Sequence, residues 1–139
     1  MNQSVQKKIL FICTHNSARS QMAEGLLNVF YKNHYQANSA GTEPSQVNPY
    51  AIKAMAEIGI DISTHHSKSI EEYQGIQFDI VVTVCDDAKE NCPFFPGNQL
   101  IHQSFEDPSA CGGSKDNIMN CFRRIRDEIK DWLETTFGE

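Results

Sequence analysis

The sequence predicts an α/β fold, a parallel β-sheet of four strands with helices on both of its faces. Short apolar or β-branched runs alternate along the chain with segments whose apolar residues recur at helical spacing. Strands that alternate with helices in this way are joined by right-handed crossovers, which makes the strands parallel and lays the helices over the sheet. Glycine and proline punctuate the chain and do not cluster in a linker, so we expect one domain spanning residues 1–139.

Two strands and two helices are predicted in the first half of the chain. The apolar run at residues 8–12 is typical of a strand covered on both faces, and residues 19–31 have the apolar spacing of a helix. Residues 37–40 form a weaker strand signal before a glycine. A second helix begins where Asn48 supplies an N-cap and Pro49 the first helical position, and it ends at Gly59.

Two further strands and a closing helix are predicted in the second half. Residues 69–73 indicate a short helical stretch, and the β-branched run at residues 78–84 indicates a buried central strand. A short fourth strand is expected at residues 99–103. The apolar residues from Ile118 to Leu133 recur at spacings of three and four, which predicts a long amphipathic helix.

Composition excludes several classes of function. Eighteen acidic against twelve basic residues give a net charge of −6, the wrong sign for a protein that neutralises nucleic-acid phosphates or binds an anionic membrane surface. The N-terminal apolar run, residues 9–12, is too short for a signal-peptide core or a membrane span. Five cysteines are an odd number with no disulfide framework. We therefore expect a cytoplasmic protein with reduced thiols and with no nucleic-acid or membrane partner.

The loop after the first predicted strand has the composition of an anion-binding site. Cys13, like Cys85, directly follows a predicted strand, at the sheet edge where α/β folds bind ligands. The backbone N–H groups of such a turn and the positive end of the next helix can hold a tetrahedral oxyanion, and Arg19 can bind two of its oxygens at once. The same positive field favours the thiolate of Cys13, which makes it a nucleophile aimed at the anion. Asn16 would hold the loop and Ser20 would donate a hydrogen bond to the thiolate. The expected oxyanion-binding residues are Thr14, His15, Asn16, Ser17, Ala18, Arg19 and Ser20.

Two other interpretations of this loop are weaker. Cys13 could be a small apolar residue at a strand end, as buried free cysteines often are. A nucleotide site would need the Gly-Lys-Ser/Thr of a P-loop, which this loop lacks. The loop is therefore expected to bind a single anion.

The segment C-T-H-N-S-A-R-S-Q-M-A-E-G resembles an active-site signature of known enzymes. It is shared by low-molecular-weight protein tyrosine phosphatases and by thioredoxin-coupled arsenate reductases of the same fold. The resemblance extends from Ile9 to about Ile129. It implies a four-stranded parallel sheet with flanking helices, Cys13 as the nucleophile and Arg19 as the anion clamp.

Two further cysteines, Cys85 and Cys92, lie seven positions apart. An α-helix between them would separate the thiols by about 10 Å, too far for a disulfide without unwinding. A zinc site is a poor fit, because structural sites use cysteines two to four apart and His102 is the only nearby extra ligand. Two unrelated cysteines at the ends of a helix are the remaining alternative.

The segment V-C-D-D-A-K-E-N-C-P-F-F-P-G resembles the redox segment of the arsenate reductases. The resemblance implies that Cys13 attacks arsenate, that Cys85 then forms a Cys13–Cys85 disulfide and releases arsenite, and that Cys92 forms a Cys85–Cys92 disulfide. Thioredoxin would reduce that last disulfide. Phosphate or sulfate would compete with arsenate, and no cofactor is expected.

Asp107, followed by Pro108, matches the family's Asp-Pro loop, which implies a general acid that protonates the departing oxygen. By composition alone, Glu106 and Asp107 could equally be a solvated pair. Phosphatases of this fold usually follow Asp-Pro with tyrosines, whereas residues 109–113 here are Ser-Ala-Cys-Gly-Gly. A low-molecular-weight tyrosine phosphatase acting through a phosphocysteine, and a non-enzymatic oxyanion-binding protein, are the alternative functions.

The remaining polar and sulfur residues are expected to have structural roles. Some relatives bind potassium near the anion loop through an aspartate where this chain has Lys68, so we expect no metal and expect the ammonium to take the cation's place. His65 and His66 are expected to be surface loop residues. Cys111 and Cys121 are expected to be a loop thiol and a packed helix thiol.

Overall fold

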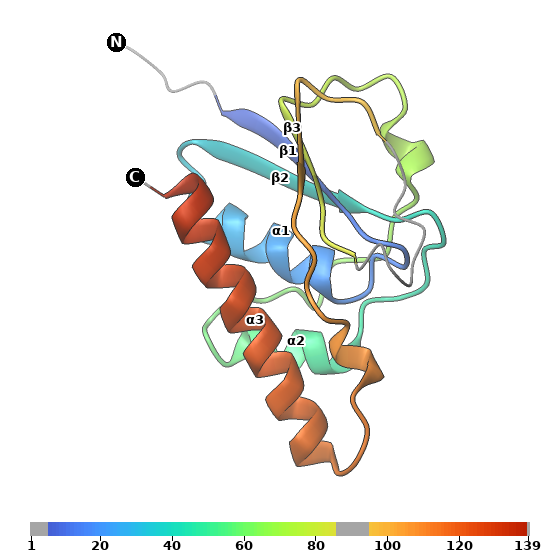
Figure 1. Ribbon diagram of the computed structural model, residues 1–139, viewed down its shortest axis with the longest axis vertical. Helices are drawn as coiled ribbons and strands as arrows, with labels where there is room; N and C mark the ends of the chain where they lie inside the picture. The colour runs from blue at the N-terminus through green and yellow to red at the C-terminus, as the bar shows by residue number, and fades with distance from the viewer. Residues whose placement is uncertain (1–5, 86–94, 139) are drawn as a thin grey trace.

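Four parallel strands form the sheet that carries the site (Figure 1). The computed structural model describes residues 6–85 and 95–138. The strands lie in the order β2-β1-β3-β4, which confirms the predicted fold class. Their bounds are β1 (Lys7–Ile12), β2 (Tyr35–Ala40), β3 (Ile80–Thr83) and β4 (Gln99–His102).

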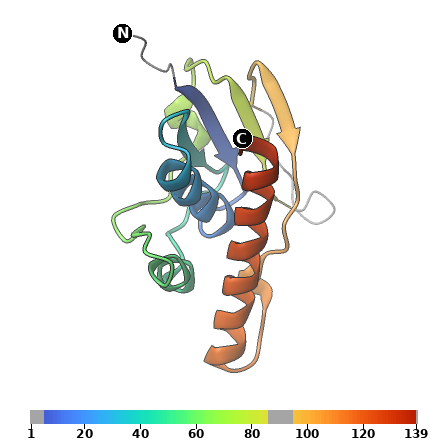
Figure 2. The same ribbon diagram turned by 90° about the vertical axis from the view of Figure 1, so that its left-hand side faces the viewer.

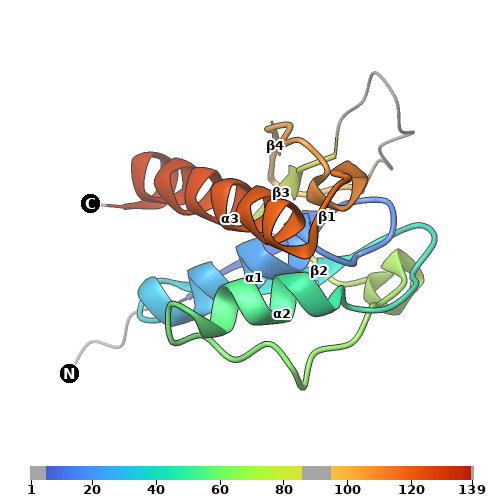
Figure 3. The ribbon, with the colours of Figure 1, turned by 90° about the horizontal axis from the view of Figure 1, so that it is seen from below.

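Three α-helices pack together against one face of this sheet (Figures 2 and 3). They are α1 (Arg19–Phe30), α2 (Pro49–Ala56) and α3 (Lys115–Phe137). The other face is covered by the short 3-10 helix η1 (Ile70–Tyr73) and by the rings of Phe78 and Phe95. A second 3-10 turn, η2 (Pro108–Ala110), precedes α3. No helix in the described parts of the chain has both the length and the apolar character to cross a membrane.

The continuous apolar run of β1 is explained by burial on both faces. Ile9 and Phe11 are fully buried in the core shared with the three α-helices, while Leu10 and Ile12 are fully buried in the smaller core beneath η1. A strand covered on both sides cannot alternate apolar and polar residues. The loop at the carboxyl end of β1 therefore starts from a strand that is buried on both faces.

A buried arginine joins α3 to α2. Arg126 donates a 2.8 Å hydrogen bond to the backbone carbonyl of Ala54 and lies 3.1 Å from a carboxylate oxygen of Glu57. Arg123 donates to the same carboxylate at 2.7 Å, and this hydrogen bond is the main cause of the lowered pKa of Glu57. α3 thereby fixes α2, whose own N-terminus is capped by the side chain of Asn48.

The expectation of two separate thiols at Cys111 and Cys121 is wrong, because these residues form a disulfide. The chain turns back at Gly113, whose φ is +96°, and enters α3 with Ser114 as N-cap. This reversal brings Cys111 over the second turn of α3, with a Cα–Cα distance of 6.6 Å, within the range for disulfides. The bond ties the segment that follows η2 to α3.

Candidate active site

The loop of residues 13–20 connects β1 to α1 at the carboxyl edge of the sheet. Cys13 is the first residue after β1; its side chain is a free thiol and the residue is only 2 % exposed. Its backbone N–H donates to the carbonyl of Ala40 at 3.2 Å, which continues the β1–β2 ladder by one residue. The nucleophile predicted from the sequence therefore directly follows a strand whose last four residues are buried.

The carbonyls of the loop point outward, toward residues 41–48. Glu43, Ser45 and Asn48 donate their backbone N–H groups to the carbonyls of Thr14, His15 and Ser17, at 2.9, 3.2 and 3.0 Å respectively. In a trans peptide the N–H points opposite to the C=O. The N–H groups of these three loop peptides therefore point toward the inside of the loop, where an anion can accept them.

Gly41 permits the close approach of the two segments. A Cβ at this position would lie 2.4 Å from the carbonyl oxygen of Thr14 and 2.7 Å from that of Cys13. Both contacts are with backbone atoms that cannot move without changing the loop. Only glycine therefore fits here.

The buried side chain of Asn16 stabilises the loop through hydrogen bonds. Asn16 has a left-handed backbone, with φ +50°, and is fully buried. Its side chain donates to the Ser20 hydroxyl at 2.8 Å and accepts from Gln21 Nε2 at 2.9 Å and from the Lys68 backbone N–H at 2.8 Å. Asparagine tolerates left-handed backbone better than most residues, and here every group of its amide is used.

The N-terminus of α1 faces the loop without a side-chain cap. Within the described residues, the side chain of Ala18 at the N-cap makes no capping hydrogen bond to the helix, and no acidic residue lies in the first turn. The first N–H groups of the helix and its positive end are thereby left for an anion. Arg19, the first residue of α1, is only 3 % exposed and donates to the carbonyl of Phe105 at 3.2 Å.

A pocket of about 210 Å³ opens above Cys13, several times the roughly 30 Å³ that a water molecule takes up in the liquid. Asp107 lies across it, with a carboxylate oxygen 3.8 Å from a guanidinium nitrogen of Arg19. Ser109 fixes this carboxylate with its backbone N–H at 3.0 Å and its hydroxyl at 2.7 Å. The lining residues are Cys13, His15, Ser17, Ala18, Arg19, Ser45, Asn48, Asp107 and Ser109.

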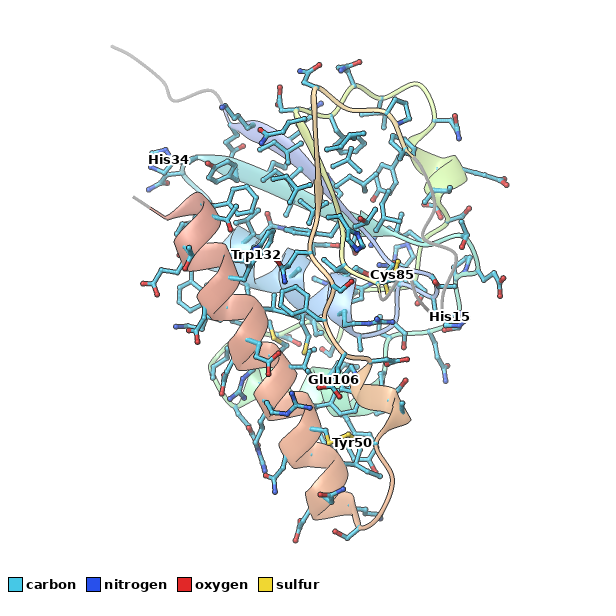
Figure 4. The ribbon with its side chains drawn as sticks, viewed as in Figure 1. His15, His34, Tyr50, Cys85, Glu106 and Trp132 are labelled. Carbon is cyan, nitrogen blue, oxygen red and sulfur yellow. A yellow bond between two sulfur atoms is a disulfide. The ribbon has the colours of Figure 1, made fainter. Side chains whose placement is uncertain are left out.

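Cys85 lies beside this site, at the end of the strand next to β1. The N–H of Val84 donates to the carbonyl of Ile12 at 2.9 Å, so Val84 and Cys85 continue β3 alongside Cys13. Cys85 is fully buried and takes part in a disulfide. In Figure 4, Cys85 and His15 both lie at the carboxyl edge of the sheet. Cys92, the third cysteine of the expected relay, lies outside the described residues.

A cluster of charged side chains lies behind the loop. Glu24 of α1 accepts from the Ser39 hydroxyl at 2.5 Å and pairs with the Lys68 ammonium at 3.5 Å, and the side chains of Glu24 and Lys68 are only 13 % and 12 % exposed. His65 is not a plain surface residue, because it is partly buried and its Nδ1 lies 3.0 Å from the Gln21 amide oxygen. His66 is exposed, as expected.

Two residues that shape the site have little or no signal in the sequence. Gly41 and Gln21 shape the loop, but each lies outside the cysteine–arginine motif and carries no reactive group. A glycine directly after a predicted strand was the available signal for Gly41. No local pattern marks Gln21, whose partners come from the loop and from residues 65 and 66.

The family model for low molecular weight phosphotyrosine protein phosphatases matches residues 8–137. The chain belongs to this family. Among its relatives, arsenate reductase 1 of Staphylococcus epidermidis is 49 % identical over 131 residues, which cover 94 % of this chain and 95 % of that one.

Solved structures of family members agree with the observed fold. A structure described as an arsenate reductase in the phosphate binding state has a TM-score of 0.81 and 31 % identity, covering 96 % of this chain and 98 % of that one. A thioredoxin-dependent arsenate reductase of Corynebacterium glutamicum has a TM-score of 0.64 and 26 % identity, covering 98 % of this chain and 65 % of that one. The predicted resemblance to the phosphatase and arsenate reductase family is confirmed.

Proposed function

We propose that this protein reduces arsenate to arsenite through a relay of Cys13, Cys85 and Cys92, with thioredoxin as the electron donor. The observation that carries the proposal is the meeting of Cys13, Arg19 and Asp107 in one pocket, with Cys85 at the end of the adjacent strand. The 49 % identity to an arsenate reductase supports arsenate as the substrate.

The first step is attack by the Cys13 thiolate on arsenic. The inward N–H groups of the loop, the N-terminus of α1 and the Arg19 guanidinium hold the tetrahedral anion and take up its charge. A sulfur–arsenic bond forms while one arsenic–oxygen bond breaks. Asp107 donates its proton to the departing oxygen, which leaves as water once fully protonated.

The second step reduces arsenic. The Cys85 thiolate attacks the sulfur of Cys13, so a Cys13–Cys85 disulfide forms and the sulfur–arsenic bond breaks. The electron pair of that bond stays on arsenic, which passes from the +5 to the +3 state and leaves as arsenite. In the β1–β3 register Cys13 lies opposite Val84, so Cys85 is its diagonal neighbour. A strand spacing of about 4.8 Å and a rise of about 3.3 Å per residue give roughly 6 Å between the two Cα atoms, within the 4.4–6.8 Å of a disulfide.

The third step regenerates the nucleophile. Cys92 attacks Cys85, which frees the Cys13 thiolate and forms a Cys85–Cys92 disulfide. A thioredoxin dithiol reduces this bond and becomes oxidised, so two electrons and two protons balance one arsenate converted to arsenite and water. The need for reduced thiols supports the cytoplasm as the compartment.

A second activity, hydrolysis of phosphate monoesters, is favoured by the same pocket. Phosphate has the tetrahedral shape and charge of arsenate, and a solved relative is described in a phosphate binding state. A phosphocysteine at Cys13 would be formed and hydrolysed without Cys85 or Cys92. We expect this activity to accompany arsenate reduction at a lower rate.

Arsenate-dependent oxidation of NADPH, coupled through thioredoxin reductase and thioredoxin, tests the proposal. The wild-type protein should turn over many times, whereas Cys92→Ser should release at most one arsenite per protein. The double variant Cys111→Ser/Cys121→Ser, which removes two sulfurs outside the relay, is the matched control and should keep multiple turnover. Full turnover by Cys92→Ser would rule out the relay, and hydrolysis of aryl phosphate alone would favour the phosphatase. Turnover with glutaredoxin but not with thioredoxin would identify glutaredoxin as the electron donor.

A further inference from the structure

Three polar side chains form a hydrogen-bonded chain beside Cys85. Thr83 Oγ1 lies 2.6 Å from Nδ1 of His102, and Nε2 of His102 lies 3.1 Å from Oγ of Ser104. Ser104 Oγ in turn donates to the backbone carbonyl of Cys85 at 3.0 Å. The chain therefore runs from the end of β3, through the end of β4, and back to the peptide that follows Cys85.

The register of the two strands creates this arrangement. Thr83 and His102 are the last paired residues of β3 and β4, so their side chains lie next to each other on the same face of the sheet. β4 is an edge strand, which leaves His102 exposed while it reaches back to Thr83. The backbone N–H of Gln103 continues the ladder by donating to the carbonyl of Thr83 at 2.9 Å.

The acceptor at the end of the chain fixes the direction of every hydrogen bond. A carbonyl only accepts, so the single hydroxyl hydrogen of Ser104 is donated to Cys85. The Ser104 oxygen then accepts from Nε2–H of His102, and in the neutral imidazole Nδ1 accepts from the hydroxyl of Thr83. In the neutral imidazole, Nε2 is therefore the donor and Nδ1 the acceptor.

This chain holds one of the two peptide planes that flank the Cα of Cys85. The other plane is held by the N–H of Phe105, which donates to the carbonyl of Val84 at 3.3 Å. With both planes fixed, the direction of the Cα–Cβ bond of Cys85 is fixed too, because two peptide planes determine the tetrahedral centre between them. The position of the Cys85 Cβ, to which the sulfur is bonded, therefore depends on Ser104 and, through it, on His102.

We propose that His102 is a positioning residue that aims Cys85 at the sulfur of Cys13 during the reduction step. The inference rests on the proposed function, since it concerns the step in which Cys85 breaks the sulfur–arsenic bond. His102 exchanges no proton or electron in that step; it keeps Ser104 oriented. Attack on a sulfur requires an aligned nucleophile, so loss of the orientation slows this step and leaves the formation of the Cys13 adduct unchanged.

Two reactions of the same protein separate this role from a general structural one. Arsenite release in a single turnover by pre-reduced protein, without thioredoxin, needs Cys85; hydrolysis of p-nitrophenyl phosphate needs only Cys13, Arg19 and Asp107. His102→Leu and Ser104→Ala should slow arsenite release about fivefold to tenfold, the equivalent of one lost hydrogen bond, with aryl phosphate hydrolysis and the KM for arsenate unchanged. His102→Gln, whose amide can both donate and accept, should restore most of the rate, and Gln99→Ala, an exposed change on the same strand, should have no effect.

Wild-type release rates in His102→Leu would overturn the proposal. An equal fall of arsenite release and aryl phosphate hydrolysis, together with a lower melting temperature, would assign His102 a structural role and overturn it as well. If the wild-type protein itself hydrolyses aryl phosphate but releases no arsenite, the proposed function fails first and the inference falls with it.

Discussion

The guanidinium of Arg19 lies 3.8 Å from the carboxylate of Asp107, across the pocket that contains Cys13. The first residue of α1 and the loop before η2 are thereby in contact, although 88 positions separate them in the sequence. Arg19 also donates to the carbonyl of Phe105, two residues before Asp107. Arg19 therefore positions the loop that carries Asp107, the expected general acid.

Asp107→Asn should slow aryl phosphate hydrolysis by about 10²-fold or more, because the amide cannot give a proton to the leaving oxygen. The effect should appear in kcat, measured with p-nitrophenyl phosphate. Glu106→Gln is the matched control, since Glu106 is the neighbouring carboxylate but is exposed and pairs with Arg124 at 3.2 Å. Equal losses in both variants would argue for a general charge effect and against an acid at Asp107.

Gly41→Ala should weaken binding of phosphate and lower the melting temperature, because the added methyl group overlaps the carbonyls of Thr14 and Cys13. We expect the dissociation constant for inorganic phosphate, measured by calorimetry, to rise at least about tenfold, since a displacement of the loop misaligns several N–H donors at once. Gly112→Ala is the control: a Cβ there meets nothing within 4 Å. Unchanged phosphate binding in Gly41→Ala would show that the loop does not depend on this close approach.

Removal of the Cys111–Cys121 disulfide should lower the free energy of unfolding. The closed loop spans a sequence separation of 10 residues, for which chain entropy predicts a loss of about 2 to 3 kcal/mol. Urea unfolding of the double variant Cys111→Ser/Cys121→Ser, compared with the wild-type protein, measures this loss in the free energy of unfolding. The same midpoint for both proteins would mean that the bond adds nothing to stability.

Potassium should change neither the melting temperature nor aryl phosphate hydrolysis, because the Lys68 ammonium already pairs with Glu24 behind the loop. The comparison is between potassium and sodium at constant ionic strength. Lys68→Met should destabilise the fold by about 1 to 2 kcal/mol, because a largely buried carboxylate loses its cation. Lys115→Met, at an exposed lysine, serves as control. A clear stabilisation of the wild-type protein by potassium would contradict the prediction.

The free energy of unfolding should fall between about pH 10 and pH 12 because of the ionisation of Tyr73. Burial, and then the charges of Glu24 and Glu72, raise the pKa of Tyr73 to about 12. A raised pKa in the folded state stabilises the fold fully below the unfolded value near 10, and this contribution is lost as the pH rises through 12. Urea unfolding at several alkaline pH values should show a shallower decline for Tyr73→Phe than for the wild-type protein, and identical slopes would refute the assignment.

The elements and the position of Cys13 after the first strand could be predicted because their signals are local. The apolar run of β1, the cap at Asn48 and the cysteine–arginine spacing are each readable within about ten residues, and the structure places Cys13 and Cys85 at the ends of adjacent strands. The strand predicted at residues 78–84 has the bounds Ile80–Thr83 in the structure, and the backbone N–H groups of Asp79 and Val84 extend its hydrogen bonds to β1 by one residue at each end.

What could not be predicted depends on contacts between distant segments. The disulfide of Cys111 and Cys121 requires the chain reversal at Gly113, and the task of His102 requires the β3–β4 register. Neither the disulfide nor the contacts of His102 can be predicted from the spacing of residues in the sequence. The partly buried position of His65 has the same origin, since its partner Gln21 lies 44 positions away in the sequence.

The outward carbonyls of residues 14, 15 and 17 have a consequence for how this loop can vary. Because they are held by the backbone of residues 41–48, the shape that would surround the anion is set by main-chain atoms. Side chains at His15 and Ser17 line the pocket without defining that shape. The sequence of the loop can therefore vary more than its geometry, which depends on the close approach of Gly41, a residue that is not among those lining the pocket.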